Sequence, residues 1–191
     1  MDRRGDLHIL ERRRSLSGSL IWRLQDNYFA ERGVEAWRQG EVPHYVTSNP
    51  TIANAYAEIV FAFRHDRQHL ASPEGPAQGP LTICELGAGS GRFAFHFLNR
   101  LGRLCEQDGT PLDSFRYVLT DVAESNLAFW REHPRFREYF ARGMLDMAVF
   151  DVTRSDVIEL QTSGARITAA GLPGPLVVLA NYLFDSVPQD L

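Results

Sequence analysis

The stretch of sequence that decides the fold is Leu81-Thr82-Ile83-Cys84-Glu85-Leu86-Gly87-Ala88-Gly89-Ser90-Gly91-Arg92-Phe93-Ala94. Residues 81–86 are a short apolar run after a loop rich in proline and glycine, which predicts a buried parallel strand. Three glycines then alternate with small residues, and apolar side chains from Phe93 to Leu101 continue at helical spacing. The stretch therefore predicts a strand, a glycine turn and a helix, which is the repeating unit of an α/β fold.

The glycine turn indicates a ligand that lies against bare main chain, because glycine has no Cβ and tolerates positive φ. The N–H groups at the start of the following helix favour a negative group. A dinucleotide fingerprint would place its third glycine at position 92, which is Arg92. The observed pattern is instead Gly-x-Gly-x-Gly, with the acid Glu85 two places before it. The alternative is a turn that closes an α/β unit and binds nothing.

Three further strands are expected along the chain, at 115–120, 144–150 and 176–180. With right-handed crossovers, the four strands would lie in the spatial order third, second, first, fourth. A β-hairpin insertion is expected at about 157–168. We therefore predict an α/β fold with a doubly wound, mostly parallel sheet that is incomplete at the C-terminus.

Helices are expected before the first strand. One begins near Leu20, Gly33 interrupts it and a short turn follows, which together predict an N-terminal helical cap. A longer helix begins at Pro50, where Ser48 or Asn49 can cap it. The core-facing stripe of that helix is predicted to contain Ile52, Ala55, Tyr56, Ile59, Val60 and Phe63.

Two loops bear on the site. Residues 105–114 are predicted to form a polar loop between the helix of the glycine turn and the second strand. In the loop before Pro50, the side chains of Tyr45, Thr47 and Ser48 either fold over a ligand or provide cap and turn contacts. Both interpretations of this second loop stay open.

The chain is divided by a linker-like composition at 71–80. We assign 1–78 to a leader and helical cap, and 79–191 to a sheet domain that carries the four strands. Within 191 residues, 44% are hydrophobic and 23% are charged, as in ordinary globular proteins. The net charge of −4 argues against a surface built for nucleic acid or an anionic membrane.

The expected location is the cytoplasm. No run approaches the ~18 apolar residues of a membrane span, and no secretory signal precedes the two cysteines, which we expect to be reduced. The arginine-rich start also fits a mitochondrial presequence, but Asp2, Asp6 and Glu11 count against that interpretation.

Polar side chains follow the other predicted strands. Asp121 ends the second strand, where a carboxylate can accept hydrogen bonds from both ribose hydroxyls of an adenosine; the alternative is a helix N-cap. Asp151 ends the third strand, where it would meet an adenine amino group or serve as a plain turn residue. Asn181 follows the fourth strand. These positions favour a nucleoside ligand without defining the reaction.

The order of these motifs resembles that of class I S-adenosylmethionine (SAM) dependent methyltransferases, in which SAM lies across the tips of strands 1 to 4. The motif residues are Glu85, Gly87, Gly89, Gly91, Asp121, Asp151 and Asn181. Within that superfamily the closest resemblance is to the MidA family, which includes a mitochondrial complex I assembly factor that acts as a protein arginine methyltransferase. It rests on Thr47-Ser48-Asn49-Pro50 and on Ala180-Asn181-x-x-x-Asp185-x-x-Pro188. The family usually has proline where Ala88 stands and glutamate where Tyr182 stands.

The resemblance implies a methyltransferase that uses SAM as its cofactor and requires no metal. The methionine part of SAM would be held by Glu85, Gly87, Ala88, Gly89 and Gly91. Asp121 would bind the ribose and Asp151 the adenine. Asn181 would face both the cofactor and the methyl acceptor, as a catalytic residue whose carbonyl accepts a hydrogen bond from an attacking amine, and Asp185 is a weaker candidate base. The acceptor is unknown, and a protein side chain is one candidate.

Two other functions stay open. A non-catalytic scaffold or assembly factor with the same fold is favoured by Tyr182, because the family's glutamate would suit a guanidinium substrate. An NAD-linked enzyme is disfavoured by Arg92 at the third glycine position.

The fourth strand needs a neighbour that the sequence does not supply. It is apolar on both faces and carries no charge or proline to protect an edge. We therefore expect either that the natural protein continues past Leu191 or that another chain covers this strand.

Overall fold

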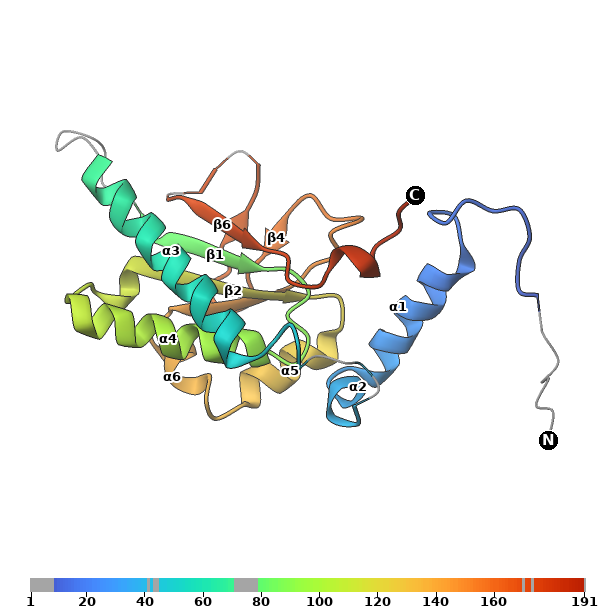
Figure 1. Cartoon of the computed structure of the whole chain (residues 1–191), viewed down its shortest axis with the longest axis horizontal. Coiled ribbons are helices and arrows are strands. Elements are labelled where there is room, and N and C mark those ends of the chain that lie inside the picture. Colours follow the sequence, from blue (N-terminus) through green and yellow to red (C-terminus); the bar gives the residue numbers. More distant parts are fainter. Residues whose placement is uncertain are drawn as a thin grey trace.

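A computed structural model of the chain describes residues 9–40, 42, 45–70, 79–169, 171–172 and 174–190. Its centre is a four-stranded, all-parallel sheet in the order β3–β2–β1–β6 (Figure 1). The strands are β1 (Leu81–Glu85), β2 (Phe115–Asp121), β3 (Leu145–Val149) and β6 (Leu176–Leu179). The predicted spatial order is confirmed, and this mixed α/β architecture is compatible with a Rossmann-like fold.

The strand register brings the chemical groups to one edge of the sheet. Glu85, the last residue of β1, lies opposite Leu119 of β2 and Leu179 of β6. Asp121, the last residue of β2, lies opposite Val149 of β3. Because all four strands are parallel, their carboxyl ends meet at the same edge, where ligands of open α/β sheets bind.

One face of the sheet is covered by helices. These are α3 (Pro50–Leu70), α4 (Arg92–Asp108), α5 (Glu124–Glu132) and α6 (Arg137–Ala141). Their apolar sides and the sheet form the main core, whose largest fully buried side chains include Trp130, Tyr117, Phe97 and Phe115. Strands β1 and β2 are buried along almost their whole length, as expected for central strands of a parallel sheet, whereas most of β6 is exposed or half-buried.

The other face is covered in part by the predicted hairpin. It consists of β4 (Ile158–Glu159) and β5 (Arg166–Ile167), which pair antiparallel. A second, smaller core joins the hairpin region to the sheet and contains Ile158, Leu160, Ile167, Cys84, Val118 and Ala148. The chain thus passes from β3 to β6 on the face opposite the helices.

The N-terminal helical cap consists of α1 (Leu20–Arg32) and α2 (Glu35–Arg38). The Ser19 hydroxyl accepts a hydrogen bond from the backbone N–H of Ile21, and Gly33 separates the two helices, as predicted. Figure 1 shows both helices beyond the carboxyl ends of β1 and β6. No residue of α1 is buried, so its apolar side chains do not join the core.

The predicted core stripe of α3 is wrong in its rotation about the helix axis. The buried residues of α3 are Ala53, Ala57 and Val60. Of the predicted stripe, Val60 alone is fully buried, whereas Ile59 is 67% and Phe63 41% exposed. The two alanines allow α3 to pack closely on α4, which a count of large apolar side chains does not detect.

The predicted polar loop at 105–114 is wrong in its first part. Helix α4 continues to Asp108, and a short 3-10 helix, η1, follows at Leu112–Ser114. Cys105 lies about one turn after Leu101 and is buried, so the apolar face of α4 is longer than expected. The helix ends at Gly109, whose φ of 76° suits a left-handed cap.

The boundary between the two predicted segments stays a prediction, because residues 71–78 lie outside the described part of the chain. Helix α3 belongs to the predicted segment 1–78, yet it contributes to the main core of the sheet. Cys84 and Cys105 are buried and unpaired by a disulfide. Across the described ranges, none of the helices combines the length and apolarity needed to cross a membrane.

Candidate functional site

A cavity of about 1150 Å³ lies at the carboxyl edge of the sheet. Its walls are the glycine turn, the ends of β2 and β3, the segment after β6, and α1. The predicted site residues that line it are Glu85, Gly87, Ala88, Gly89, Asp121, Asp151 and Asn181. Gly91 does not line the cavity. A Cβ on Gly91 would lie 3.1 Å from the buried side chains of Trp130 and Phe136, so this glycine faces the core.

The Gly89 peptide is held from both sides. Its N–H donates to Asp121 Oδ2 at 2.9 Å, and its carbonyl accepts a hydrogen bond from Trp130 Nε1 at 3.0 Å. Gly89 has a φ of 55°, and the other two glycines of the turn also have positive φ, as expected. This backbone conformation therefore favours glycine here.

The chain's own side chains lie against the bare faces of two turn glycines. A Cβ on Gly87 would lie 3.0 Å from Leu183 Cδ1, and a Cβ on Gly89 would lie 2.9 Å from Trp37 Cζ2. The close approach expected from a ligand is thus made, at these two points, by Leu183 and Trp37. The alternative of a turn that closes an α/β unit stays open for these glycines.

Glu85 is a buried acid, with 3% of its surface exposed. Its Oε2 accepts a hydrogen bond from the Tyr117 hydroxyl at 2.8 Å. Burial raises the pKa of Glu85 to about 8; the bond from Tyr117 lowers it in part, and the nearby Asp121 raises it. Glu85 is therefore mostly protonated at neutral pH and would gain its charge when a cation binds beside it. The sequence analysis missed Tyr117, whose buried hydroxyl needs a partner.

Asp121 combines a local backbone contact with a bond to the glycine turn. Its Oδ1 accepts from the N–H of Ala123 at 3.0 Å, while Oδ2 accepts from Gly89. Burial raises its pKa, and these two backbone bonds oppose the rise. Ala123 is the N-cap of α5, so its bond to Asp121 is similar to the predicted N-cap contact, but Asp121 lies two residues before the N-cap position. Each oxygen still has a second lone pair, so hydrogen bonds to ribose hydroxyls also stay possible.

Asn126 lies behind Asp121 on α5 and is completely buried. Its amide makes no hydrogen bond of good geometry within the described ranges, but it lies close enough to lower the pKa of Asp121. A buried amide in this position favours the ionised form of the acid.

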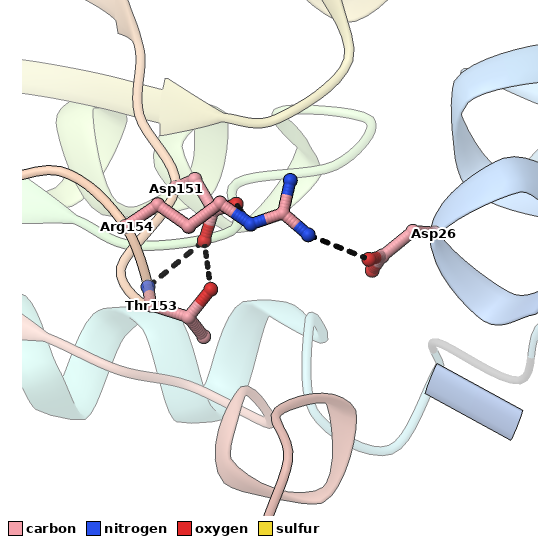
Figure 2. A network of polar contacts seen from close by, with 4 residues as sticks. All are labelled: Asp26, Asp151, Thr153 and Arg154. Carbon is pink, nitrogen blue, oxygen red and sulfur yellow. Dashed lines mark hydrogen bonds and ion pairs between the residues drawn. The ribbon is translucent and has the colours of Figure 1, made fainter. Parts of the chain in front are cut away.

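Asp151 belongs to a polar network between β3 and α1, shown in Figure 2. Its Oδ1 accepts from the N–H and the hydroxyl of Thr153 at 2.8 and 2.6 Å, and its Oδ2 lies 3.4 Å from Arg154 Nε. Arg154 also reaches Asp26 of α1 at 4.0 Å. The predicted turn role is thus observed. The exposed pair with Asp26 contributes only about 0–1 kcal/mol to holding α1 in place.

Asn181 joins the segment after β6 to the loop before α3. Its Nδ2 donates to the carbonyl of Thr47 at 2.9 Å, and its side-chain oxygen stays available for another donor. Thr47 and Ser48 line the cavity, and the cap of α3 is Asn49, whose Oδ1 accepts from the N–H of Ile52 at 3.0 Å. The loop therefore provides cap contacts and also lies on the cavity wall.

The segment after β6 holds one unusual backbone conformation. Tyr182 has a φ of 57°, in the left-handed region that residues other than glycine seldom adopt, and its side chain is 60% exposed. Asp185 follows in the short 3-10 helix η2 (Phe184–Ser186) and is exposed on the cavity wall. Such strain is found most often at functional positions.

An aromatic side of the cavity was not foreseen. It is formed by Trp22, Tyr28 and Phe29 of α1 together with Trp37 of α2. The rings of Phe29 and Trp37 stack with centroids 5.5 Å apart. Such rings can cover a planar base or a cation. The signal in the sequence that could have revealed this side is the concentration of aromatic residues between positions 22 and 37.

Comparisons with protein-family models, with curated proteins and with solved structures found no match for this chain. Within the described ranges, His, Cys, Asp and Glu side chains form no group of three that could hold a metal ion.

Proposed function

We propose that this cavity binds SAM and that the protein is a SAM-dependent methyltransferase of the MidA type. The observation that carries the proposal is that Glu85 and Asp121, the last residues of adjacent parallel strands, line one cavity with the glycine turn between them. Two acids on one wall suit a ligand that carries an ammonium group at one end and ribose hydroxyls at the other.

The residues present fit such a ligand in size and in chemistry. The cavity of about 1150 Å³ is somewhat larger than the about 300–1,000 Å³ usual for small-molecule pockets, so it has room for SAM. Glu85 would hold the ammonium of the methionine part and Asp121 the ribose. The buried Nε of Arg92, which has no acceptor among the described residues, adds a donor on the same wall.

SAM supplies a sulfonium methyl group that is already a strong electrophile, so the protein has mainly to align the acceptor and exclude water. The side-chain oxygen of Asn181 would accept a hydrogen bond from an attacking amine. Its amide is oriented for this by the bond to Thr47. A protein side chain is one candidate acceptor.

The proposal is tested by replacing Asp121. In Asp121→Ala we expect SAM to bind about 10- to 100-fold more weakly, since hydrogen bonds to a charged group contribute about 1.5–3 kcal/mol each. Isothermal titration calorimetry with SAM and S-adenosylhomocysteine measures the change. The control is Asp113→Ala, an exposed acid before the opposite end of β2. An unchanged affinity in Asp121→Ala would show that the ribose assignment is wrong.

A non-catalytic scaffold is the second candidate. It is supported by Leu183 and Trp37, which cover two turn glycines, and by Tyr182 in the place of the family's acid. Absence of binding heat with both SAM and S-adenosylhomocysteine would favour the scaffold. Mass analysis of candidate acceptors incubated with SAM then separates a binding protein from an enzyme.

A further inference from the structure

Arg92 is a cation on the wall of the cavity, whereas in the sequence it stands out only as a departure from the dinucleotide pattern. It is the first residue of α4 and directly follows the glycine turn, while Glu85 precedes the turn and lies on the same wall. The Arg92 guanidinium lies over the ring of Tyr45, 5.2 Å from its centroid. This contact places the guanidinium beside the loop before α3.

Arg92 has no acidic partner within the described part of the chain. Other arginines do have one: Arg100 pairs with Glu58 at 2.6 Å, and Arg142 pairs with Glu138 at the same distance. The Nε of Arg92 is buried and has no hydrogen-bond acceptor among the described residues. Buried donors of this kind are rare because each one gives up its bond to water, so the group calls for an acceptor from elsewhere.

The buried acids of the cavity wall do not supply that acceptor. Asp121 accepts from the N–H groups of Gly89 and Ala123, and Glu85 accepts from the hydroxyl of Tyr117. The wall thus combines acids that accept hydrogen bonds inside the protein with a guanidinium that has no acidic partner among the described residues.

We infer that Arg92 binds the carboxylate of an amino-acid moiety of the ligand, which under the proposed function is the α-carboxylate of the methionine part of SAM. This inference rests on that proposed function. A zwitterion requires an acid for its ammonium and a cation for its carboxylate, and Glu85 and Arg92 provide these on the two sides of the turn. The planar fork of a guanidinium matches a carboxylate with two parallel hydrogen bonds.

The test compares ligands with and without the carboxylate on the full chain. Isothermal titration calorimetry is carried out with SAM, with decarboxylated SAM and with methylthioadenosine, which lacks the whole amino-acid end. In Arg92→Gln we expect SAM to bind about 10- to 100-fold more weakly, while the affinities for the other two ligands stay unchanged. Arg92→Lys should retain part of the affinity for SAM, because it keeps the charge and loses the fork.

The matched control is Arg103→Gln, an exposed arginine of the same helix outside the cavity wall, which should bind all three ligands like the unaltered protein. Decarboxylated SAM also serves as an internal check on folding. Equal weakening of all three ligands in Arg92→Gln, or unchanged binding of SAM, would overturn the assignment to Arg92 and leave the proposed function standing. Failure of the unaltered protein to bind any of the three would overturn both.

Discussion

At the scale of single residues, the site is governed by buried polar groups whose partners come from neighbouring strands. Glu85 and Tyr117 lie 32 positions apart in the chain, yet they share one hydrogen bond inside the core. Gly89 and Asp121 are likewise 32 positions apart. The sequence pattern placed each group on its own strand or turn, but which groups become partners depends on the register between strands. The hydrogen bond from Tyr117 to Glu85 is therefore revealed only by the structure.

Glu85 makes the stability of the protein depend on pH. Its pKa is about 8 in the folded protein, against 4.5 for an ordinary glutamate. The folded state thus keeps a proton that the unfolded chain releases, so the free energy of unfolding falls as pH rises from about 4.5 to about 8. The slope from one such group is at most about 1.4 kcal/mol per pH unit. In Glu85→Gln, which keeps an acceptor for Tyr117, we expect this loss to disappear.

Urea denaturation between about pH 5.5 and about pH 8.5 measures the difference. The free energy of unfolding of Glu85→Gln should gain on that of the unaltered protein up to about pH 8 and run parallel above it. The exposed Glu132→Gln is the control. Parallel curves for Glu85→Gln over the whole range would contradict the raised pKa.

At the scale of elements, α3 shows how far apolar spacing can mislead. The sequence pattern predicted a stripe that includes Ala55 and Ile59, and the structure instead buries Ala53 and Ala57. Large side chains dominate such a pattern, but close packing of two helices selects small ones at the contact. The start of the helix was predicted correctly, because Asn49 and Pro50 act through local backbone chemistry.

Two leucine substitutions on α3 distinguish the two stripes. Ala57 is completely buried, so Ala57→Leu should lower the free energy of unfolding by about 1–3 kcal/mol through overpacking. Ala55 is exposed, so Ala55→Leu should change it by less than about 0.5 kcal/mol. Urea denaturation of both variants measures these changes. A larger loss in Ala55→Leu would restore the stripe expected from the sequence.

At the scale of the whole molecule, the sheet ends in a strand that the described residues leave open. The outer edge of β6 has no strand partner among them. Val178 lies opposite Cys84 in the register, on the hairpin side of the sheet, but it is 51% exposed, and Leu176 is 43% exposed. An exposed apolar edge strand favours the expectation that more of the protein, or another chain, covers the fourth strand.

If a second copy of this chain covers β6, the protein should associate with itself as its concentration rises. Val178→Lys should then shift the protein toward the monomer, because a charge would be buried in the contact. Size-exclusion chromatography with light scattering measures the shift. The control is Leu70→Lys at the far end of α3, where the side chain is 85% exposed. A chain that stays monomeric at all concentrations, with or without Val178→Lys, would contradict coverage by a second copy.

The sequence by itself determined the parallel sheet, its strand order, the hairpin, the starts of α1 and α3, and the positive φ of the turn glycines. Each of these follows from residues close together in the chain and from the handedness of crossovers. Only the tertiary structure decided which face of α3 is buried, that Trp37 lies on Gly89, and that Asn181 donates to Thr47 across 134 positions. Such contacts depend on side-chain shape and on distances between elements, which no local pattern along the chain encodes.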